Sequence, residues 1–281
     1  MDFNRFLNRS PQSFFLIAGP CAIEDEKTAF EIAHHVDSVS QSLNIPYIFK
    51  GSFKKANRTK MDSFKGIGDI KALKILHHVG QTLKIPVLTD IHESHDAPIA
   101  AQYVDVLQIP AFLIRQTDLI IAAAQTGKTI NLKKGQFLSP ESMKFAIEKV
   151  KSAGNTNVFI TERGTQFGYS DLVVDFRGIP KMRSLAPTVM DITHALQQPN
   201  RSGGVTGGAP HLIETIGRAA VAVGIDGLFI ETHPDPLMAQ SDGKNMLKLG
   251  QIENLLKRFV AIHQTVVSFQ SNHSSPCSKS I

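Results

Sequence analysis

Short runs of apolar residues recur along the chain, and each is followed by polar residues and then by a segment with helical periodicity. The runs are continuous rather than alternating, which is typical of parallel strands covered on both faces. This pattern predicts a parallel sheet in which a helix follows each strand. The eight runs are FFLIAGP (14–20), YIFKGSF (47–53), VLTDIH (87–92), VLQIPAF (106–112), TINLKK (129–134), VFITERG (158–164), TVMDITH (188–194) and GLFIETH (227–233).

Helical segments lie between these runs, for example at 24–43, 140–154 and 212–224, where apolar residues recur at three- and four-residue spacing. Eight strand-then-helix units in 281 residues predict an α/β protein with a single-domain (β/α)8 TIM barrel. An open doubly wound sheet is the rival. It usually has fewer strands and a glycine-rich fingerprint after the first one, and GPCAIE does not match that fingerprint.

The barrel is expected over residues 13–267, preceded by a short N-terminal extension at 1–12. Residues 268–281 are polar and are expected to form a disordered tail. The segment 197–211 is rich in glycine and polar residues, so it is either a mobile lid over a site or a connection without a role.

Composition limits the class of protein. The chain is 42% hydrophobic and 20% charged, as is usual for a soluble globular enzyme. Two cysteines argue against a disulfide scaffold and favour a reducing, intracellular setting. We expect neither a signal peptide nor a membrane span. Lysine and arginine exceed the acids only by 30 to 25, without basic blocks, which argues against a nucleic-acid partner.

Functional side chains gather where the expected strands run into loops, which is where barrel enzymes place their active sites. Four cations at these ends, around one small volume, would repel each other unless an anion lay among them. Each lysine alone could equally pair with a neighbouring acid, but this explanation is weaker for all of them on successive strands. The four cations are Lys50, Lys55, Lys133 and Arg163.

A second subset combines a soft sulfur, an imidazole and two carboxylates, which suits a divalent transition metal. The spacing has no metal signature of its own, because the grouping depends on the barrel. Taken alone, His194 could be a hydrogen-bonded core residue, and Asp242 could cap the helix expected at GKNMLKL. The subset is Cys21, His194, Glu231 and Asp242.

The motifs at the strand ends closely resemble one family, the 3-deoxy-D-manno-octulosonate 8-phosphate synthases, over roughly residues 14–265. The matching stretches are AGPCAIE, FKGSFKKANRTK, TDIHE, QIPAFLIRQTDL, INLKKGQF, TERGTQFGY, DITHALQ, FIETHPDP and SDGKN. The related 3-deoxy-D-arabino-heptulosonate 7-phosphate synthases share some of these elements but typically have KPRT where this chain has KANRT. That difference favours the octulosonate enzyme, and the heptulosonate enzyme, which uses erythrose 4-phosphate, is the alternative.

The resemblance implies condensation of phosphoenolpyruvate with D-arabinose 5-phosphate and water, with release of inorganic phosphate. It also implies a cytoplasmic homotetramer in lipopolysaccharide biosynthesis, with no nucleic-acid or membrane partner. Members with cysteine after the first strand depend on a divalent metal, whereas members with asparagine there do not. Cys21 therefore places this chain in the metal-dependent branch, with zinc, iron, manganese or a similar ion as cofactor.

Site roles carry over by position in the matching motifs. Catalytic roles fall on His194, Lys55, Asp242 and Asn57, and the metal ligands are Cys21, His194, Glu231 and Asp242. Phosphoenolpyruvate is expected on Lys50, Lys55, Lys133 and Arg163, and the sugar phosphate on Asn57, Arg58 and Asp90, with Ser52, Gln136 and His194 close by. Arg115 lies in a segment that reaches a neighbouring subunit's site in the family.

Two other classes of protein remain as rivals. A non-enzymatic barrel that binds sugar phosphates would need no metal group beside the anion site. A nucleic-acid-binding protein would carry its basic residues along one outer face rather than at strand ends.

Overall fold

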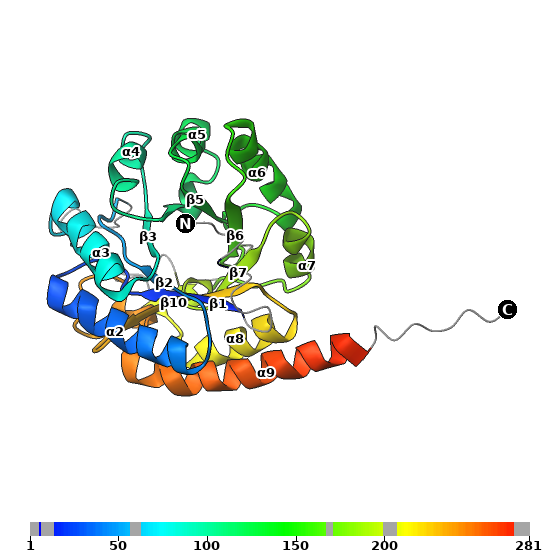
Figure 1. Ribbon diagram of the computed structural model, residues 1–281. Coiled ribbons are helices and arrows are strands. Elements are labelled where there is room, and N and C mark those ends of the chain that lie inside the picture. The colour runs from blue at the N-terminus through cyan, green and yellow to red at the C-terminus, as the bar shows by residue number, and fades with distance from the viewer. Residues whose placement is uncertain (1–5, 7–13, 57–62, 167–170, 199–206, 273–281) are drawn as a thin grey trace.

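The structure is a computed structural model that describes residues 6, 14–56, 63–166, 171–198 and 207–272. Eight parallel strands follow one another around a closed sheet, and β1 completes the circle by pairing with both β2 and β10 (Figure 1). The expected (β/α)8 barrel is confirmed. Its strands are β1 (Phe15–Gly19), β2 (Tyr47–Lys50), β3 (Val87–Asp90), β4 (Val106–Ile109), β5 (Thr129–Lys133), β6 (Val158–Glu162), β7 (Thr188–Asp191) and β10 (Gly227–His233).

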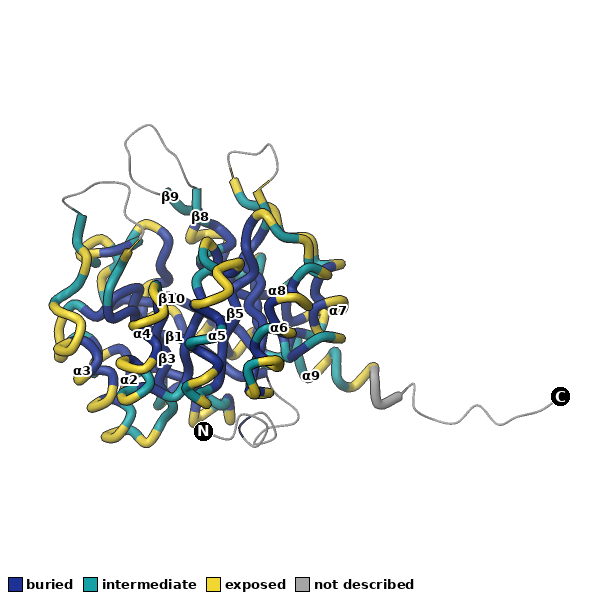
Figure 2. The backbone as a smooth tube through the Cα atoms, turned by 90° about the horizontal axis from the view of Figure 1, so that it is seen from above, coloured by how far each residue is buried: buried dark blue, intermediate teal, exposed yellow. Residues whose placement is uncertain are grey.

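Helices surround the strands, with their exposed faces directed outward (Figures 1 and 2). They are α2 (Glu26–Ser42), α3 (Asp69–Leu83), α4 (Asp96–Ala100), α5 (Thr117–Gln125), α6 (Met143–Ser152), α7 (Gly178–Arg183), α8 (Ile213–Ala222) and α9 (Ile252–Asn272). The described part of the chain also forms the short 3-10 helices η1 (Ala111–Leu113), η2 (Pro140–Ser142), η3 (His194–Leu196), η4 (Pro210–Leu212), η5 (Gly243–Asn245) and η6 (Leu249–Gln251).

Two small strand pairings extend the carboxyl end of the barrel. β11 (Leu247–Lys248) pairs in parallel with the end of β10. β8 (Gln197–Gln198) and β9 (Gly207–Gly208) pair antiparallel, so the base of the glycine-rich segment is a two-stranded ribbon. Residues 199–206 of that segment lie outside the described residues, and a lid role stays a prediction.

Local sequence sets the helix boundaries. α2 begins after Asp25, whose Oδ1 accepts a hydrogen bond from the backbone N–H of Thr28 at 2.7 Å. This bond satisfies one of the N–H groups that have no partner within the helix. The expected helix at 140–154 is divided, because Ser139 and Pro140 open a 3-10 turn before α6 begins at Met143.

The strands are buried on both faces, which explains their continuous apolar runs. Ile48 and Phe159 belong to one apolar cluster, whereas their chain neighbours Phe49 and Ile160 belong to another that includes the helix side chains. Because strand side chains alternate between faces, the first cluster fills the barrel interior and the second lies between strands and helices.

Phe6 adds to the interior cluster from outside the strands. It is 3% exposed, and its ring meets that of Phe15 edge-on with centroids 5.9 Å apart. An aromatic residue of the N-terminal extension therefore packs against the apolar interior at the start of β1.

The C-terminal helix is longer than expected. The sequence predicts a tail over residues 268–281, but α9 continues to Asn272. Ser268 fits the helix because its hydroxyl donates a hydrogen bond to the carbonyl oxygen of Thr265 at 2.8 Å. None of the described helices combines the length and apolar character that crossing a bilayer requires.

Gly217 gives a test of how tightly α8 and α9 pack. A Cβ atom added at this position would lie 2.2 Å from Cζ of the buried Phe259 ring, so Gly217→Ala should lower the free energy of unfolding by about 1–3 kcal/mol. Gly250→Ala is the matched control, since an added Cβ there meets nothing within 4 Å, and it should change stability by less than about 0.5 kcal/mol. Urea-unfolding midpoints of both variants measure this, and equal midpoints would contradict the packing.

Candidate active site

The interior face of the barrel changes from apolar to charged toward the carboxyl ends of the strands. A side chain two positions after an inward residue also points inward. Lys50 follows the interior residue Ile48 in this way, and Glu231 follows Phe229. The resulting layer of buried charged side chains is Lys50, Asp90, Lys133, Arg163, Asp191 and Glu231.

A possible metal-ligand group lies at one side of this layer. The ligand atoms of Cys21, Glu231 and Asp242 all lie within 4.8 Å of one another. Cys21 follows β1, Glu231 is in β10, and Asp242 lies in the loop after β10, so the pairing of β1 with β10 brings them together. One sulfur and two carboxylates are donors that fit a divalent transition-metal ion.

Asp242 does not cap a helix, and this alternative is wrong. It precedes η5, but its side chain makes no capping hydrogen bond. Instead the Cys21 thiol donates to Oδ2 of Asp242 at 3.4 Å. The backbone of Asp242 has φ of 50°, a left-handed conformation that costs energy for a non-glycine residue and is found at functional sites.

The Cys21 thiol is fully buried beside polar groups. Its sulfur lies 3.0 Å from the hydroxyl of Ser241. Burial raises the pKa of Cys21 to about 12, and the neighbouring carboxylates of Glu231 and Asp242 act in the same direction. A cation is what would stabilise the thiolate in this position.

His194 lies between two carboxylates. Its Nδ1 is 2.7 Å from Oδ2 of Asp191, and its Nε2 is 3.3 Å from Oε2 of Glu231. The imidazole is therefore next to the three-residue group without belonging to the set of mutually close ligand atoms. The hydrogen bond to Asp191 is one that a core histidine would also make. In addition, His194 faces Glu231, one of the candidate metal ligands.

Charges of opposite sign alternate through the site. Lys50 Nζ lies 2.5 Å from Oε1 of Glu231, and Lys133 Nζ donates to Oδ2 of Asp191. Burial alone would raise the pKa of both carboxyl groups. His194 and the lysines outweigh it, so the pKa of Asp191 lies well below its usual range and that of Glu231 falls to about 2. Burial lowers the pKa of Lys133, and Asp191 offsets part of that effect.

Two of the four expected cations form no ion pair with any acid in the described ranges. Burial works to lower the pKa of Lys55, but the nearby carboxylates of Asp90 and Glu231 raise it. Arg163 uses Nη2 to donate to the carbonyl oxygen of His194 at 3.0 Å and to Oε1 of Gln197 at 2.5 Å. Both cations retain charge that can face an anion.

Several buried polar atoms have no hydrogen-bond partner within the part of the chain that the structure describes. Buried polar groups in native proteins are normally satisfied, so such atoms gathered in one place indicate where a ligand or water binds. Four of them belong to residues expected to bind substrate. They are Ser52 Oγ, Asp90 Oδ1, Gln136 Oε1 and Arg163 Nε.

Some expected site residues are not brought into this cluster. Asn57 and Arg58 lie outside the described residues. Arg115 is exposed in the turn between η1 and α5, where its carbonyl oxygen accepts a hydrogen bond from Lys149. Its expected contact with a neighbouring subunit stays a prediction.

Three polar residues at the site were not among the expected site residues. Asp191 and His92 stand at strand ends in DITH and DIHE, and Ser241 precedes Asp242. Asp191 holds His194, and His92 Nε2 lies 3.1 Å from Oδ2 of Asp90. The two-residue period along β7 would have indicated Asp191, because it places this residue on the same face as Val189 of the interior cluster.

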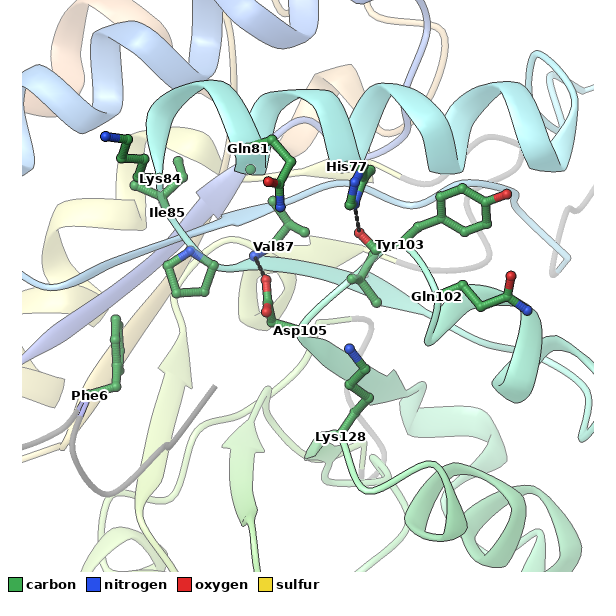
Figure 3. A pocket seen from close by; sticks show the side chains of 13 residues that line it. Phe6, His77, Gln81, Lys84, Ile85, Val87, Gln102, Tyr103, Asp105 and Lys128 are labelled. Atoms are coloured by element: carbon green, nitrogen blue, oxygen red, sulfur yellow. Dashed lines mark hydrogen bonds between the residues drawn. The ribbon is translucent and has the colours of Figure 1, made fainter.

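A separate cavity of about 570 Å³ lies at the opposite end of the strands, next to Phe6 (Figure 3). It is lined from α3, from the start of β3 and from Lys128, and Asp105 in its wall accepts a hydrogen bond from the backbone N–H of Val87 at 3.0 Å. No residue expected at the active site lines it. The described residues of the candidate site therefore lie apart from this cavity.

Known proteins are similar to nearly the whole of this chain. A protein of Koribacter versatilis named 2-dehydro-3-deoxyphosphooctonate aldolase is 50% identical over 255 residues, which cover 90% of this chain and 92% of that protein. Proteins of the same name from Cyanothece sp. and Brucella canis are 51% and 50% identical, over 89% and 91% of this chain and 92% of each relative. The model of the DAHP synthetase I family matches residues 7–267. The chain belongs to the DAHP synthetase I family.

Proposed function

We propose that this protein is an enzyme that condenses phosphoenolpyruvate with D-arabinose 5-phosphate and water to give 3-deoxy-D-manno-octulosonate 8-phosphate and inorganic phosphate. The observation that carries this proposal is that buried lysine and arginine side chains lie directly beside the metal-ligand group of Cys21, Glu231 and Asp242. The relatives named 2-dehydro-3-deoxyphosphooctonate aldolase support it. A barrel that only bound sugar phosphates would have no use for this second group.

The family name also covers the heptulosonate enzyme, which is the alternative. The curated relatives at about half identity carry the octonate name over nine-tenths of the chain. The KANRT segment at 55–59 supports the same choice, although Asn57 and Arg58 lie outside the described residues. Arabinose 5-phosphate is therefore the proposed aldose.

The cations have a defined part in the reaction. The enol carbon of phosphoenolpyruvate attacks the aldehyde carbon of the sugar, and water adds at the carbon that carries the phosphate. The adduct then loses inorganic phosphate by cleavage of a C–O bond. Lys50, Lys55, Lys133 and Arg163 offset the repulsion between two anionic substrates and hold phosphoenolpyruvate in a reactive orientation.

The remaining residues act around the aldehyde and the water. Asp90 and Ser52 each present an unpartnered oxygen that can meet sugar hydroxyls, and Gln136 does so from the β5 side. His194 stands between the cation layer and the ligand group, where Nε2 can bind an ion or hold a proton. Asn57 and Arg58 are proposed to contact the sugar phosphate.

Cys21, His194, Glu231 and Asp242 are the residues that would hold a divalent metal ion such as zinc, iron or manganese. When bound, such an ion orients the aldehyde or water and lowers the pKa of that water. The chain's own contribution is a thiol, two carboxylates and an imidazole beside the layer of buried charged side chains.

Assembly, location and domain limits are proposed on the resemblance. We propose a cytoplasmic homotetramer. The exposed side chain of Phe112, three positions before Arg115, and that of Phe137, which lies close to Gly135 as Ile114 does, support an interface there. The catalytic domain is proposed over residues 13–267, with an extension at 1–12, whose Phe6 packs into the barrel, and a tail that begins after α9.

Aldose preference tests the proposed function. Inorganic phosphate release with phosphoenolpyruvate should be at least about 100-fold more efficient, in kcat/KM, with arabinose 5-phosphate than with erythrose 4-phosphate, because a polar site built for the longer sugar leaves groups unpaired with the shorter one. A preference for erythrose 4-phosphate would support the heptulosonate alternative. Binding of both sugars without phosphate release would support the non-enzymatic barrel.

Metal removal tests the ligand group. Chelator-treated protein should lose phosphate release and regain it with a divalent ion, and Cys21→Ala should lower kcat by about 10- to 100-fold or more, because one ligand is lost. Cys277→Ala changes the chain's other cysteine and should behave as wild type. Cys21→Asn should retain some metal-independent activity. Full turnover of metal-free Cys21→Ala protein would remove the metal from the mechanism.

The pKa of Cys21 gives a pH dependence. Because this pKa is raised to about 12, the thiol is protonated near neutral pH and must lose its proton when it binds a metal ion. At pH values well below the pKa of Cys21, the loss of this one proton should therefore make the apparent Zn²⁺ affinity rise by roughly tenfold per pH unit. Calorimetry in buffers of different ionisation enthalpy should show about one proton fewer released by Cys21→Ala than by wild type. Equal proton release would show that the thiol is not a ligand.

A further inference from the structure

Asp191 is the most heavily hydrogen-bonded carboxylate among the described residues of the site. It lies at the end of β7 and is fully buried. Oδ1 accepts hydrogen bonds from the backbone N–H of Thr193 at 3.1 Å, from its hydroxyl at 2.9 Å and from the backbone N–H of His194 at 2.8 Å. Oδ2 faces Nδ1 of His194 at 2.7 Å and also accepts from Lys133.

We propose that Asp191 is a positioning residue that orients His194 toward the metal-ligand group and, through its second contact, holds Lys133 in the phosphoenolpyruvate site. This inference rests on the proposed function, because it assigns Asp191 a task in the same site. Asp191 would touch neither the ion nor the substrate and would act through the two side chains it holds.

The two ring nitrogens of His194 face different partners. A carboxylate only accepts hydrogen bonds, so the contact with Asp191 keeps a proton on Nδ1. Nε2 then faces Glu231 and is the nitrogen left for an ion. In metal sites a carboxylate on the far nitrogen of a histidine sets both the tautomer and the ring orientation, and its loss typically weakens metal affinity by about 10- to 100-fold.

The backbone contacts of Asp191 make this orientation rigid. The N–H groups of Thr193 and His194 fix the carboxylate relative to the turn that carries His194. The hydroxyl of Thr193 also accepts a hydrogen bond from the backbone N–H of Glu231 at 3.2 Å. Asp191 and Thr193 thus tie the end of β7 to β10, where Glu231 lies.

Lys133 is the second side chain that Asp191 holds. Its ammonium lies 3.8 Å from the centroid of the Phe229 ring and 3.4 Å from Nδ1 of His194. Without the carboxylate, two cationic or potentially cationic groups would face each other in a buried site. Asp191 therefore contacts both a lysine of the proposed phosphoenolpyruvate site and the histidine next to the metal-ligand group.

Cobalt binding without substrates tests the positioning role. Co²⁺ bound to a thiolate gives a visible absorption band, so titration of metal-free protein measures affinity without turnover. Asp191→Asn should weaken Co²⁺ binding by about 10- to 100-fold. In a His194→Ala background the same change should have less than about threefold effect, because the side chain through which Asp191 acts is gone.

A matched control and a milder variant complete the design. Asp96→Asn changes another buried aspartate that binds a lysine and backbone N–H groups but does not contact His194, and it should leave Co²⁺ affinity unchanged. Thr193→Val keeps the charge of Asp191 and removes the two hydrogen bonds of the Thr193 hydroxyl, one to Asp191 and one from the backbone of Glu231. It should weaken binding by about fivefold. This variant carries the test if Asp191→Asn does not fold, as judged by circular dichroism.

Different results would contradict the positioning role of Asp191 and the proposed binding of a metal ion. The positioning role is overturned if Asp191→Asn and Thr193→Val bind Co²⁺ as wild type, or if Asp191→Asn costs as much in the His194→Ala background. If wild-type protein shows no thiolate band with Co²⁺, the metal part of the proposed function fails instead. The affinity of metal-free protein for phosphoenolpyruvate, measured by calorimetry, should also fall in Asp191→Asn and not in Asp96→Asn, and no fall would remove the role at Lys133.

Discussion

A row of ion pairs and hydrogen bonds runs across the carboxyl end of the barrel, from Lys50 through Glu231, His194 and Asp191 to Lys133. Burying any one of these charges alone would cost several kcal/mol, and breaking such a pair typically costs about 3–5 kcal/mol. Each buried lysine is tolerated because a carboxylate lies within ion-pair distance, Glu231 for Lys50 and Asp191 for Lys133, and His194 lies between the two carboxylates. The position of each side chain therefore depends on its neighbours, and the site is held as a unit.

The closed parallel sheet is what makes this row possible. Every second side chain of a strand points into the barrel. These inward side chains are apolar along most of each strand and charged at its carboxyl end. The pairing of β1 with β10 then sets Cys21 beside Glu231, although the two residues lie at opposite ends of the barrel sequence. An open sheet with the same strand ends would separate the thiol from that carboxylate.

Glu231 belongs to both halves of the site. One oxygen binds Lys50 of the cation layer, and the other faces His194 beside the metal-ligand group. A bound anion that attracted Lys50 would weaken its ion pair with Glu231, and a metal ion bound to Glu231 would do the same. Binding in one half of the site would therefore change the electrostatic environment of the other half. The proposed reaction needs two anionic substrates and an activated water or aldehyde in one place, and this shared carboxylate joins the groups that would serve them.

The fold and most of the candidate site could be predicted from local patterns in the sequence. Continuous apolar runs and helical spacing depend on neighbouring residues, so the sequence by itself determined the eight strands, their order and the residue types at their ends. Local patterns place Asp191 at a strand end without indicating a role for it. For Asp242 they predict a metal ligand and leave helix capping open as the alternative, which its geometry excludes. Only the tertiary structure decided which acid meets which cation, and that Cys21 meets Asp242 across 221 positions of sequence. The physical reason is that these contacts act over a few ångströms between distant segments, so they exist only once the barrel has closed.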